Sequence, residues 1–237
     1  EHVSQELWKR IEFFSVYGFN KSHAVAYAIG SYYSAWLHTH YETDWLGTIL
    51  ESENGNPKNL SKAISEIKAM GYNVSTPDIN ESGFEWTWSD NKKSFIPPLT
   101  SIKGLGKNAV KEIFENRPYT SLDQMLYDEE GKWYHSKLNK TGFAALCSVE
   151  ALDVLEEVWK GEIKNHKQLY EIVIENYNVL KKSKFGMTLR QAARKNAEPL
   201  LPKLIEDTQD MEDWSRIEKL QMYGARSLIQ CNLTQYG

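Results

Sequence analysis

Apolar residues recur at helical spacing along most of this chain, and this periodicity constrains the fold more than any other feature. They stand three or four residues apart, the spacing that gives a helix one apolar face. Gly18 and Gly71 each follow such a stretch, at the position where glycine commonly ends a helix. We predict helices over about residues 4–17, 22–41, 43–52, 57–70, 165–182, 188–196, 199–208 and 212–223, with shorter pieces between 99 and 159.

One short region has the period of a strand instead. Phe84, Trp86 and Trp88 alternate with other residues, and Phe95-Ile96 is a candidate partner across a turn. Pro97-Pro98 keeps the second strand short or at an edge, because proline cannot donate a backbone hydrogen bond to a sheet. The predicted fold class is therefore mainly α with a small β element.

Changes in composition and in apolar periodicity divide the chain into four predicted parts. A helical part is followed by a stretch with a proline and little periodicity, and then by short helices around a glycine-containing hairpin. The last helices have no assigned role. The predicted parts are residues 1–72, 73–98, 99–158 and 159–237.

Composition limits the kinds of function. The net charge of the 237 residues is −4, so a nucleic-acid function must rest on local basic patches and not on the whole surface. No apolar run reaches the ~20 residues that a membrane helix needs. The chain has two distant cysteines, Cys147 and Cys231, and no secretory signal pattern, so we expect a cytoplasmic protein without a membrane span.

The stretch GFNKSHAVAY gathers phosphate-binding side chains at a predicted helix start. Unpaired N–H groups and the helix dipole favour an anion there. Lys21, Ser22 and His23 add a charge, a hydroxyl and a ring N–H, and Tyr27 stands one turn further along the same face. This arrangement fits a nucleoside triphosphate. The alternative, which spacing alone favours, is an N-cap by Asn20 or Ser22, a solvated lysine and a core tyrosine.

The stretch LTSIKGLGKNAVKEIFENR predicts a helix-hairpin-helix. Gly104 and Gly106 allow positive φ and close backbone approach, and Leu105 between them would anchor the hairpin in the core. Amides at the start of the second helix can hold a DNA phosphate without reading sequence. Three lysines crowd the same end: Lys103, Lys107 and Lys111. The alternative is a structural hairpin that contacts no ligand.

Three further features carry less functional information. Residues 181–203 hold seven cations and one acid, and residues 206–218 are acidic; solvated faces or charge pairing between helices is the main interpretation, and phosphate tracking the alternative. Adjacent carboxylates at 128–130 and 156–157 point apart on a helix, so no hydrolytic site is predicted. Gln124 to Tyr127 faintly resembles a clamp-binding peptide, but packing of a helix onto the hairpin is favoured.

The order of these motifs resembles one continuous region of a C-family bacterial replicative DNA polymerase, the alpha subunit of DNA polymerase III. The matching stretches are GFNKSHAVAYAIGSYYSAWLHTHY, DWLGTILESE, MGYNVSTPDINESGFEWTW, LTSIKGLGKNAVKEI and LNKTGFAALCSVEALDVL. The resemblance covers about residues 1–158 and is most specific at residues 18–27 and at Pro77-Asp78-x-Asn80. It is expected to fade after about residue 160.

The resemblance implies roles for the predicted parts. The first would be the C-terminal part of the polymerase fingers, which close over the incoming nucleotide, and the third a helix-hairpin-helix module that grips duplex DNA. The implied nucleotide-binding residues are Asn20, Lys21, Ser22, His23 and Tyr27. The implied DNA-binding residues are Lys103, Gly104, Leu105, Gly106, Lys107 and Lys111, with Leu138 to Val149 as a degenerate second half.

In that family the metal-bound aspartates lie in a palm, and this sequence contains no palm. Mg²⁺ is therefore expected in the palm of the parent polymerase, while this chain, with no predicted cofactor, metal site or catalytic residue, is expected to be inactive alone. The expected partners are primer-template DNA, the incoming dNTP and the palm-bearing remainder, with a sliding clamp as a further candidate. The chain would be a fragment or one polypeptide of a split enzyme, in a bacterial or virus-infected bacterial cell. The alternative class is a non-catalytic DNA-binding or interaction module.

Overall fold

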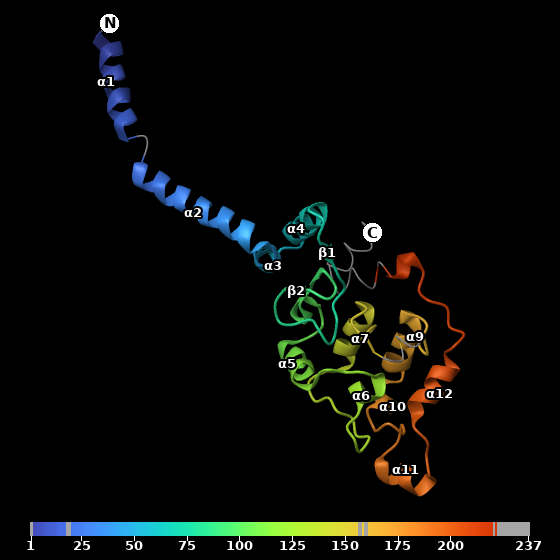
Figure 1. Cartoon of the computed structure of the whole chain (residues 1–237). Helices are drawn as coiled ribbons and strands as arrows, with labels where there is room; N and C mark the ends of the chain where they lie inside the picture. Colours follow the sequence, from blue (N-terminus) through green and yellow to red (C-terminus); the bar gives the residue numbers. More distant parts are fainter. Residues whose placement is uncertain (1, 18–19, 156–157, 159–160, 220, 222–237) are drawn as a thin grey trace. The chain divides into compact units, whose positions relative to one another are not determined.

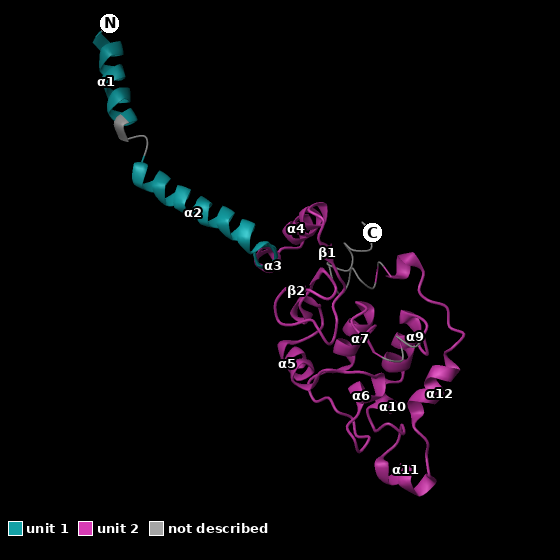
Figure 2. Ribbon diagram, viewed as in Figure 1, with its two compact units in different colours: residues 1–46 teal, residues 47–237 magenta. Residues whose placement is uncertain are grey.

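The computed structural model describes residues 2–17, 20–155, 158, 161–219 and 221. It is mainly α-helical with one small sheet, which confirms the predicted fold class (Figure 1). The chain forms two compact units, residues 1–46 and residues 47–237 (Figure 2). The four-part division predicted from the sequence stays a prediction. Among the described residues, no helix is both long and apolar enough to cross a membrane.

The first unit consists of α1 (His2–Tyr17), α2 (Lys21–His40) and the beginning of α3 (Glu42–Glu53). The helices begin and end close to the predicted residues, but the apolar face of α2 buries no side chain. Large apolar side chains are exposed on both long helices. They are Val3, Leu7, Trp8, Ile11, Phe13, Phe14, Val25, Tyr27, Ile29, Tyr32, Tyr33, Trp36 and Leu37. Tyr27 is 67% exposed, so the interpretation of this residue as a core tyrosine is wrong.

The second unit includes α4 (Pro57–Ala69), which begins as the sequence predicts. Pro57 occupies the first helical turn, and the Asn56 side chain accepts a hydrogen bond from the Asn59 N–H at 3.3 Å. The apolar face of the helix is buried, through Leu60, Ala63, Ile64 and Ile67. Gly71 follows α4 with a φ of +93°, a left-handed conformation that glycine adopts without strain.

The sheet contains three short strands in the order β1-β3-β2: β1 (Asn73–Val74), β2 (Thr87–Ser89) and β3 (Ser94–Ile96). β3 pairs in parallel with β1 and antiparallel with β2. The sequence predicted the antiparallel pair and missed β1, because two residues are too short a stretch to show a period.

The predicted strand over residues 84–88 is wrong at its start, since β2 begins at Thr87. The Phe84 ring lies against the Phe114 ring, with 5.6 Å between centroids. The backbone N–H of Trp86 donates to the Glu51 carboxylate at 3.1 Å. Contacts to other elements therefore replace sheet pairing before Thr87.

The remaining helices of the second unit are short. They are α5 (Lys107–Asn116), α6 (Leu122–Leu126), α7 (Lys140–Ser148), α9 (His166–Tyr170), α10 (Tyr177–Leu180), α11 (Leu189–Lys195) and α12 (Leu200–Asp207), with a 3₁₀ turn η1 (Leu99–Ser101) and a π-helical segment η2 (Glu171–Glu175). The single helix predicted over 165–182 is therefore divided into three pieces. The helix predicted over 212–223 is helical from residue 216 among the described residues.

One continuous apolar core connects the hairpin region with the later helices. Leu105 and Phe143 belong to the same buried cluster as Val173, Leu180 and Leu201. The later helices, to which sequence analysis assigned no role, thus pack against the hairpin region. This packing fixes the hairpins within a larger body, which a two-helix motif alone cannot do.

Candidate nucleic-acid interface

The predicted hairpin forms between η1 and α5. Gly104 has a φ of +101°, and Gly106 is the N-cap residue directly before α5. Leu105 is buried, and its N–H donates to the Ile102 carbonyl at 3.2 Å, so it anchors the turn as the sequence predicts. Space around Gly106 is open, since an added Cβ would meet no atom within 4 Å.

Three exposed lysines surround this turn. Lys103 and Lys107 flank the glycines, and Lys111 lies one turn into α5, where its ammonium is 3.7 Å from the Glu115 carboxylate. Solvent-exposed lysines beside the unpaired N–H groups of a helix start can bind a phosphate. The structure therefore brings all six predicted DNA-binding residues together at one turn.

A second helix start, that of α7, lies beside the first. We call residues 136–139 together with α7 the second hairpin. Asn139 caps α7, its side chain accepting from the Gly142 N–H at 3.0 Å, and Lys137 and Lys140 are exposed next to it. The two starts share a hollow of about 290 Å³. The hollow is lined by Gly104, Gly106, Lys107, Asn108, Ala109, Lys137, Asn139 and Gly142.

Gly142 makes this close approach possible. An added Cβ there would lie 2.6 Å from Leu138 Cδ1 and 3.2 Å from Leu105 Cδ1, so the leucines of the two hairpins meet above this glycine. Sequence reasoning selected Leu138 to Val149 as a degenerate second half, but it missed Lys137, Asn139 and Lys140 as site residues. The sequence signal that could have identified these residues is Leu138 followed by Asn139, a residue type that commonly caps helices.

Glu112 joins the two hairpins. Its carboxylate accepts hydrogen bonds from the backbone N–H groups of Ser136 at 2.8 Å, Lys137 at 3.0 Å and Leu138 at 2.9 Å. It also accepts from the Ser136 hydroxyl at 2.9 Å. Burial by itself would raise the pKa of Glu112, but these donors outweigh it and lower the pKa to about 2. The segment before α7 is therefore fixed to α5 by an ionised carboxylate.

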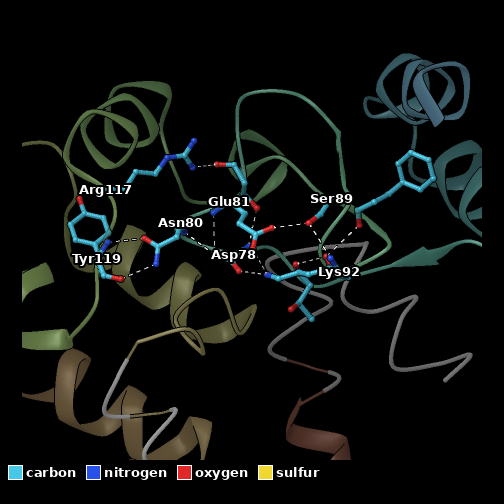
Figure 3. Close-up of polar contacts among 11 residues, drawn as sticks. Asp78, Asn80, Glu81, Ser89, Lys92, Arg117 and Tyr119 are labelled. Atoms are coloured by element: carbon cyan, nitrogen blue, oxygen red, sulfur yellow. Dashed lines mark hydrogen bonds and ion pairs between the residues drawn. The ribbon is translucent and has the colours of Figure 1, made fainter. Parts of the chain in front are cut away.

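The stretch Pro77 to Asn80 joins the sheet region to the hairpin region (Figure 3). One oxygen of the buried Asp78 accepts from the N–H groups of Asn80 at 2.8 Å and Glu81 at 3.1 Å, and the other pairs with the Lys92 ammonium. Although burial lowers the pKa of Lys92, its bonds to Asp78 and Glu81 raise it overall. These contacts fix a loop, so this motif has a structural role in the described chain.

Asn80 extends the same network across the molecule. Its side-chain amide donates to the Tyr119 carbonyl at 2.8 Å and accepts from the Tyr119 N–H at 2.8 Å. Close by, Arg117 donates to the Ser82 carbonyl at 2.7 Å (Figure 3). Its guanidinium carbon also lies 4.2 Å from the centroid of the Phe114 ring. Two bonds to one backbone residue hold the sheet region in a defined position against the segment that follows α5.

The candidate nucleotide-binding residues lie together at the start of α2. The Asn20 side chain accepts a hydrogen bond from the His23 N–H at 3.1 Å, which is the predicted N-cap. Lys21, Ser22 and His23 are exposed, and the rings of His23 and Tyr27 lie 4.3 Å apart between centroids. Gly18 and Phe19, which precede the cap, lie outside the described residues. The predicted cluster therefore forms, with its side chains open to solvent.

The carboxylates at 128–130, expected on a helix, lie instead in a turn between Tyr127 and Trp133, which form an isolated β-bridge. Asp128 accepts from the Lys132 N–H at 2.8 Å, and Glu130 pairs with the Lys132 ammonium. Residues 156–157 lie outside the described part of the chain. The stretch 124–127 is mostly buried: Met125 and Leu126 are inaccessible and Tyr127 is 4% exposed, as the packing interpretation expects.

A group of potential metal ligands occurs at Glu150, Asp153 and His166. His166 Nε2 is 3.0 Å from an Asp153 oxygen, and Nδ1 is 3.7 Å from Glu150. Burial lowers the pKa of His166, but the two carboxylates raise it overall. A set that includes a histidine differs from the all-oxygen set that Mg²⁺ prefers, so these residues do not replace the carboxylates of a polymerase palm.

Comparison with known proteins identifies the family. A family described as a helix-hairpin-helix motif matches residues 71–160, which include both hairpins. DNA polymerase III subunit alpha of Pseudomonas aeruginosa is 32% identical over 170 residues, 72% of this chain and 14% of the relative. That of Xylella fastidiosa is 31% identical over 217 residues, 89% of this chain and 17% of the relative. The chain belongs to the family of DNA polymerase III alpha subunits.

The alpha-subunit relatives are much longer than this chain. The subunit of Aquifex aeolicus is 28% identical over 254 residues, covering all of this chain and 22% of the relative. This chain thus spans between about one seventh and one fifth of the length of these three relatives. The alignments to the Xylella and Aquifex subunits extend beyond residue 160 into the last helices, whereas the alignment to the Pseudomonas aeruginosa subunit covers 170 residues; the expected fading of the similarity stays a prediction.

Proposed function

We propose that this chain is part of a replicative DNA-directed DNA polymerase and works in two places. The paired hairpins hold duplex DNA, and the start of α2 binds the phosphates of the incoming dNTP. The observation that supports the first role best is the hollow shared by two helix starts, each with exposed lysines.

The paired hairpins suit a sequence-independent duplex contact. Among the described residues no side chain caps the start of α5, and Gly106 leaves room for a phosphate to approach the main chain there. Two exposed cations, Lys107 and Lys137, line the hollow, and the exposed Lys103 and Lys140 are each adjacent in sequence to a lining residue. Such contacts position DNA and do not read its sequence. The Glu112 bonds keep the two hairpins in register, so both can engage one duplex.

The start of α2 suits a triphosphate. Lys21, Ser22 and His23 offer a cation and two hydrogen-bond donors beside the positive end of the helix dipole. The Tyr27 ring lies beside the His23 ring, tilted by 60°, and offers an aromatic surface for the sugar or base of the same nucleotide. All of these groups except Tyr27 lie within the first turn, which matches the compact charge of a triphosphate.

The exposed apolar side chains of α1 and α2 offer a contact surface for a further partner. Isolated soluble units rarely expose contiguous large apolar patches, and such patches commonly mark contact surfaces. The palm-bearing remainder of the polymerase is the partner we propose for these faces. That part would also hold the Mg²⁺ ions and the carboxylates that phosphoryl transfer requires, so this chain alone is expected to be inactive.

The competing function is a non-catalytic DNA-binding or interaction module that has kept the fold. Both functions use the hairpins, and they differ at α2. In the module, substitutions at Lys21 and His23 leave every measurable activity unchanged.

Duplex binding by the whole chain tests the hairpin role. The double substitution Lys103→Ala/Lys107→Ala is expected to weaken binding equally for unrelated sequences and to reduce the slope of log K against log salt by about one to two. Lys58→Ala/Lys62→Ala in α4 removes the same charge elsewhere and serves as the control. Equal effects of the two double variants would refute the hairpin contact.

A further inference from the structure

The cations of residues 181–203, which we call the basic lobe, belong to a second basic segment of the second unit. The lobe contains Lys181, Lys182, Lys184, Arg190, Arg194, Lys195 and Lys203, and all except the half-buried Lys184 are exposed. The segment holds one acid, Glu198, in a chain whose net charge is −4. Positive charge is therefore concentrated in this segment, although the chain as a whole is negatively charged.

The lobe is held firmly on the body of the unit. The Lys184 N–H donates to the Gly131 carbonyl at 3.0 Å, and the Leu200 N–H donates to the Lys184 carbonyl at 2.8 Å. Gly186 has a φ of +70°, and an added Cβ would lie 2.8 Å from Leu200 Cδ2. Because the backbone is already ordered, binding an anion here costs little conformational entropy.

The cations of the lobe are not neutralised by carboxylates. Within the described residues, no ion pair joins the lobe to an acid, and the charge pairing with residues 206–218 that the sequence suggested does not form. In that acidic segment, Asp213 pairs with Lys219 and Glu218 accepts from Ser215. Two acids of that segment, Asp213 and Glu218, are thus engaged with their own neighbours and not with the lobe.

The arrangement of charge on α11 favours an external anion. Arg190 and Arg194 stand four residues apart on the same face of the helix, where like charges repel each other. The helix dipole favours Arg194 and Lys195 at the C-terminal turn, but it gives no benefit to Arg190 at the beginning. A bound polyanion removes this repulsion. α11 also lies at one end of the second unit, beyond α10 and α12 (Figure 1).

We propose that the basic lobe is a second contact surface for nucleic-acid backbone, separate from the two hairpins. This inference rests on the proposed DNA-binding function and adds a site to it. Arginine and lysine side chains on an ordered surface suit phosphates, because guanidinium groups match phosphate oxygens in pairs. Exposed cations without base-reading geometry predict binding that does not depend on sequence.

The salt dependence of binding by the whole 237-residue chain tests this site. The probes are a 30-base-pair duplex, a single strand of the same length, and polyglutamate as a protein-like polyanion. The lobe variant is Lys182→Gln/Arg190→Gln/Arg194→Gln. The control with equal charge loss is Lys58→Gln/Lys62→Gln/Lys93→Gln, which changes exposed lysines far from α11 in sequence.

The lobe variant is expected to reduce the slope of log K against log salt by about two to three, and to weaken nucleic-acid binding about 10- to 100-fold near physiological salt. If the lobe variant loses affinity for the duplex alone, the lobe binds the duplex backbone. If it loses affinity equally for the single strand, the lobe binds the backbone of both single-stranded and duplex nucleic acid. A lobe variant that behaves like its control overturns the proposal, as does polyglutamate binding as tight as duplex binding.

The two proposals fail in different ways. If Lys103→Ala/Lys107→Ala has no effect while the lobe variant weakens binding, the hairpin role fails and the lobe stands. If the hairpin variant weakens binding and the lobe variant does not, the lobe fails and the hairpin role stands. Circular dichroism and the unfolding midpoint, measured on every variant, confirm that each is folded.

Discussion

The carboxylate of Glu112 in α5 accepts a hydrogen bond from the backbone N–H of Leu138 at 2.9 Å, and so ties one hairpin to the other. The same carboxylate accepts from the N–H groups of Ser136 and Lys137. One side chain therefore sets the distance between the two proposed phosphate sites.

Glu112→Gln is expected to lower the free energy of unfolding at pH 7 by about 2 kcal/mol, since bonds to a charged acceptor are stronger than bonds to a neutral one. Urea denaturation measures this change. Glu115→Gln, an exposed neighbour on the same helix, is the control and is expected to change the stability by less than about 0.5 kcal/mol. A Glu112 variant as stable as this control would contradict the structural role.

The pH dependence of stability gives a second test of Glu112. Its pKa is lowered from the ordinary 4.5 to about 2 in the folded chain. The stability it contributes is therefore complete above about pH 4.5 and is lost as the pH falls toward 2. In urea denaturation between pH 5 and pH 2.5, the wild-type chain should lose about 2 kcal/mol more than Glu112→Gln. Parallel pH profiles would show that the carboxylate is not held as described.

Asn80→Ala is expected to destabilise the second unit by about 2–3 kcal/mol. The substitution removes two 2.8 Å bonds and leaves the N–H and carbonyl of Tyr119 without these partners. Chemical denaturation measures the loss. Asn91→Ala, in the exposed turn between β2 and β3, provides a matched asparagine control. If both variants unfold at the same denaturant concentration, the network in Figure 3 does not hold the loop.

Two glycine-to-alanine substitutions should have opposite effects, one mainly on stability and the other mainly on duplex affinity. Gly142→Ala is expected to destabilise the chain by about 1–3 kcal/mol, because its Cβ would overlap Leu138 and crowd Leu105. Gly106→Ala has open space and should cost less than about 1 kcal/mol, while it reduces duplex affinity by hindering a phosphate at the main chain. Thermal unfolding and duplex titration on both variants measure the pair. Reversed stabilities would contradict the packing at Gly142.

In the complete polymerase, Lys21→Ala and His23→Ala are each expected to raise KM for all four dNTPs about 10-fold or more, because each removes a charge-assisted or ring N–H donor to phosphate. Duplex affinity should stay within about twofold of the wild-type value. Steady-state kinetics with each dNTP gives the result, and Lys9→Ala in α1 is the control. Unchanged KM values would favour the non-catalytic module.

The sequence by itself determined the helical fold class, the hairpin glycines at 104 and 106 and the family, because these depend on local spacing and on residues adjacent in the chain. It left Asn20 and Ser22 as alternative caps of α2, and the structure has Asn20. Only the tertiary structure decided that Glu112 binds residues 136–138, that Lys137 lies beside Lys107 around one hollow, and that the later helices share the hairpin core. It also decided that the apolar face of α2 stays exposed and that the lobe cations are not paired with residues 206–218. The physical reason is distance along the chain: periodicity and capping act over a few residues, whereas burial and carboxylate partners depend on segments brought together from 20 to 100 residues apart.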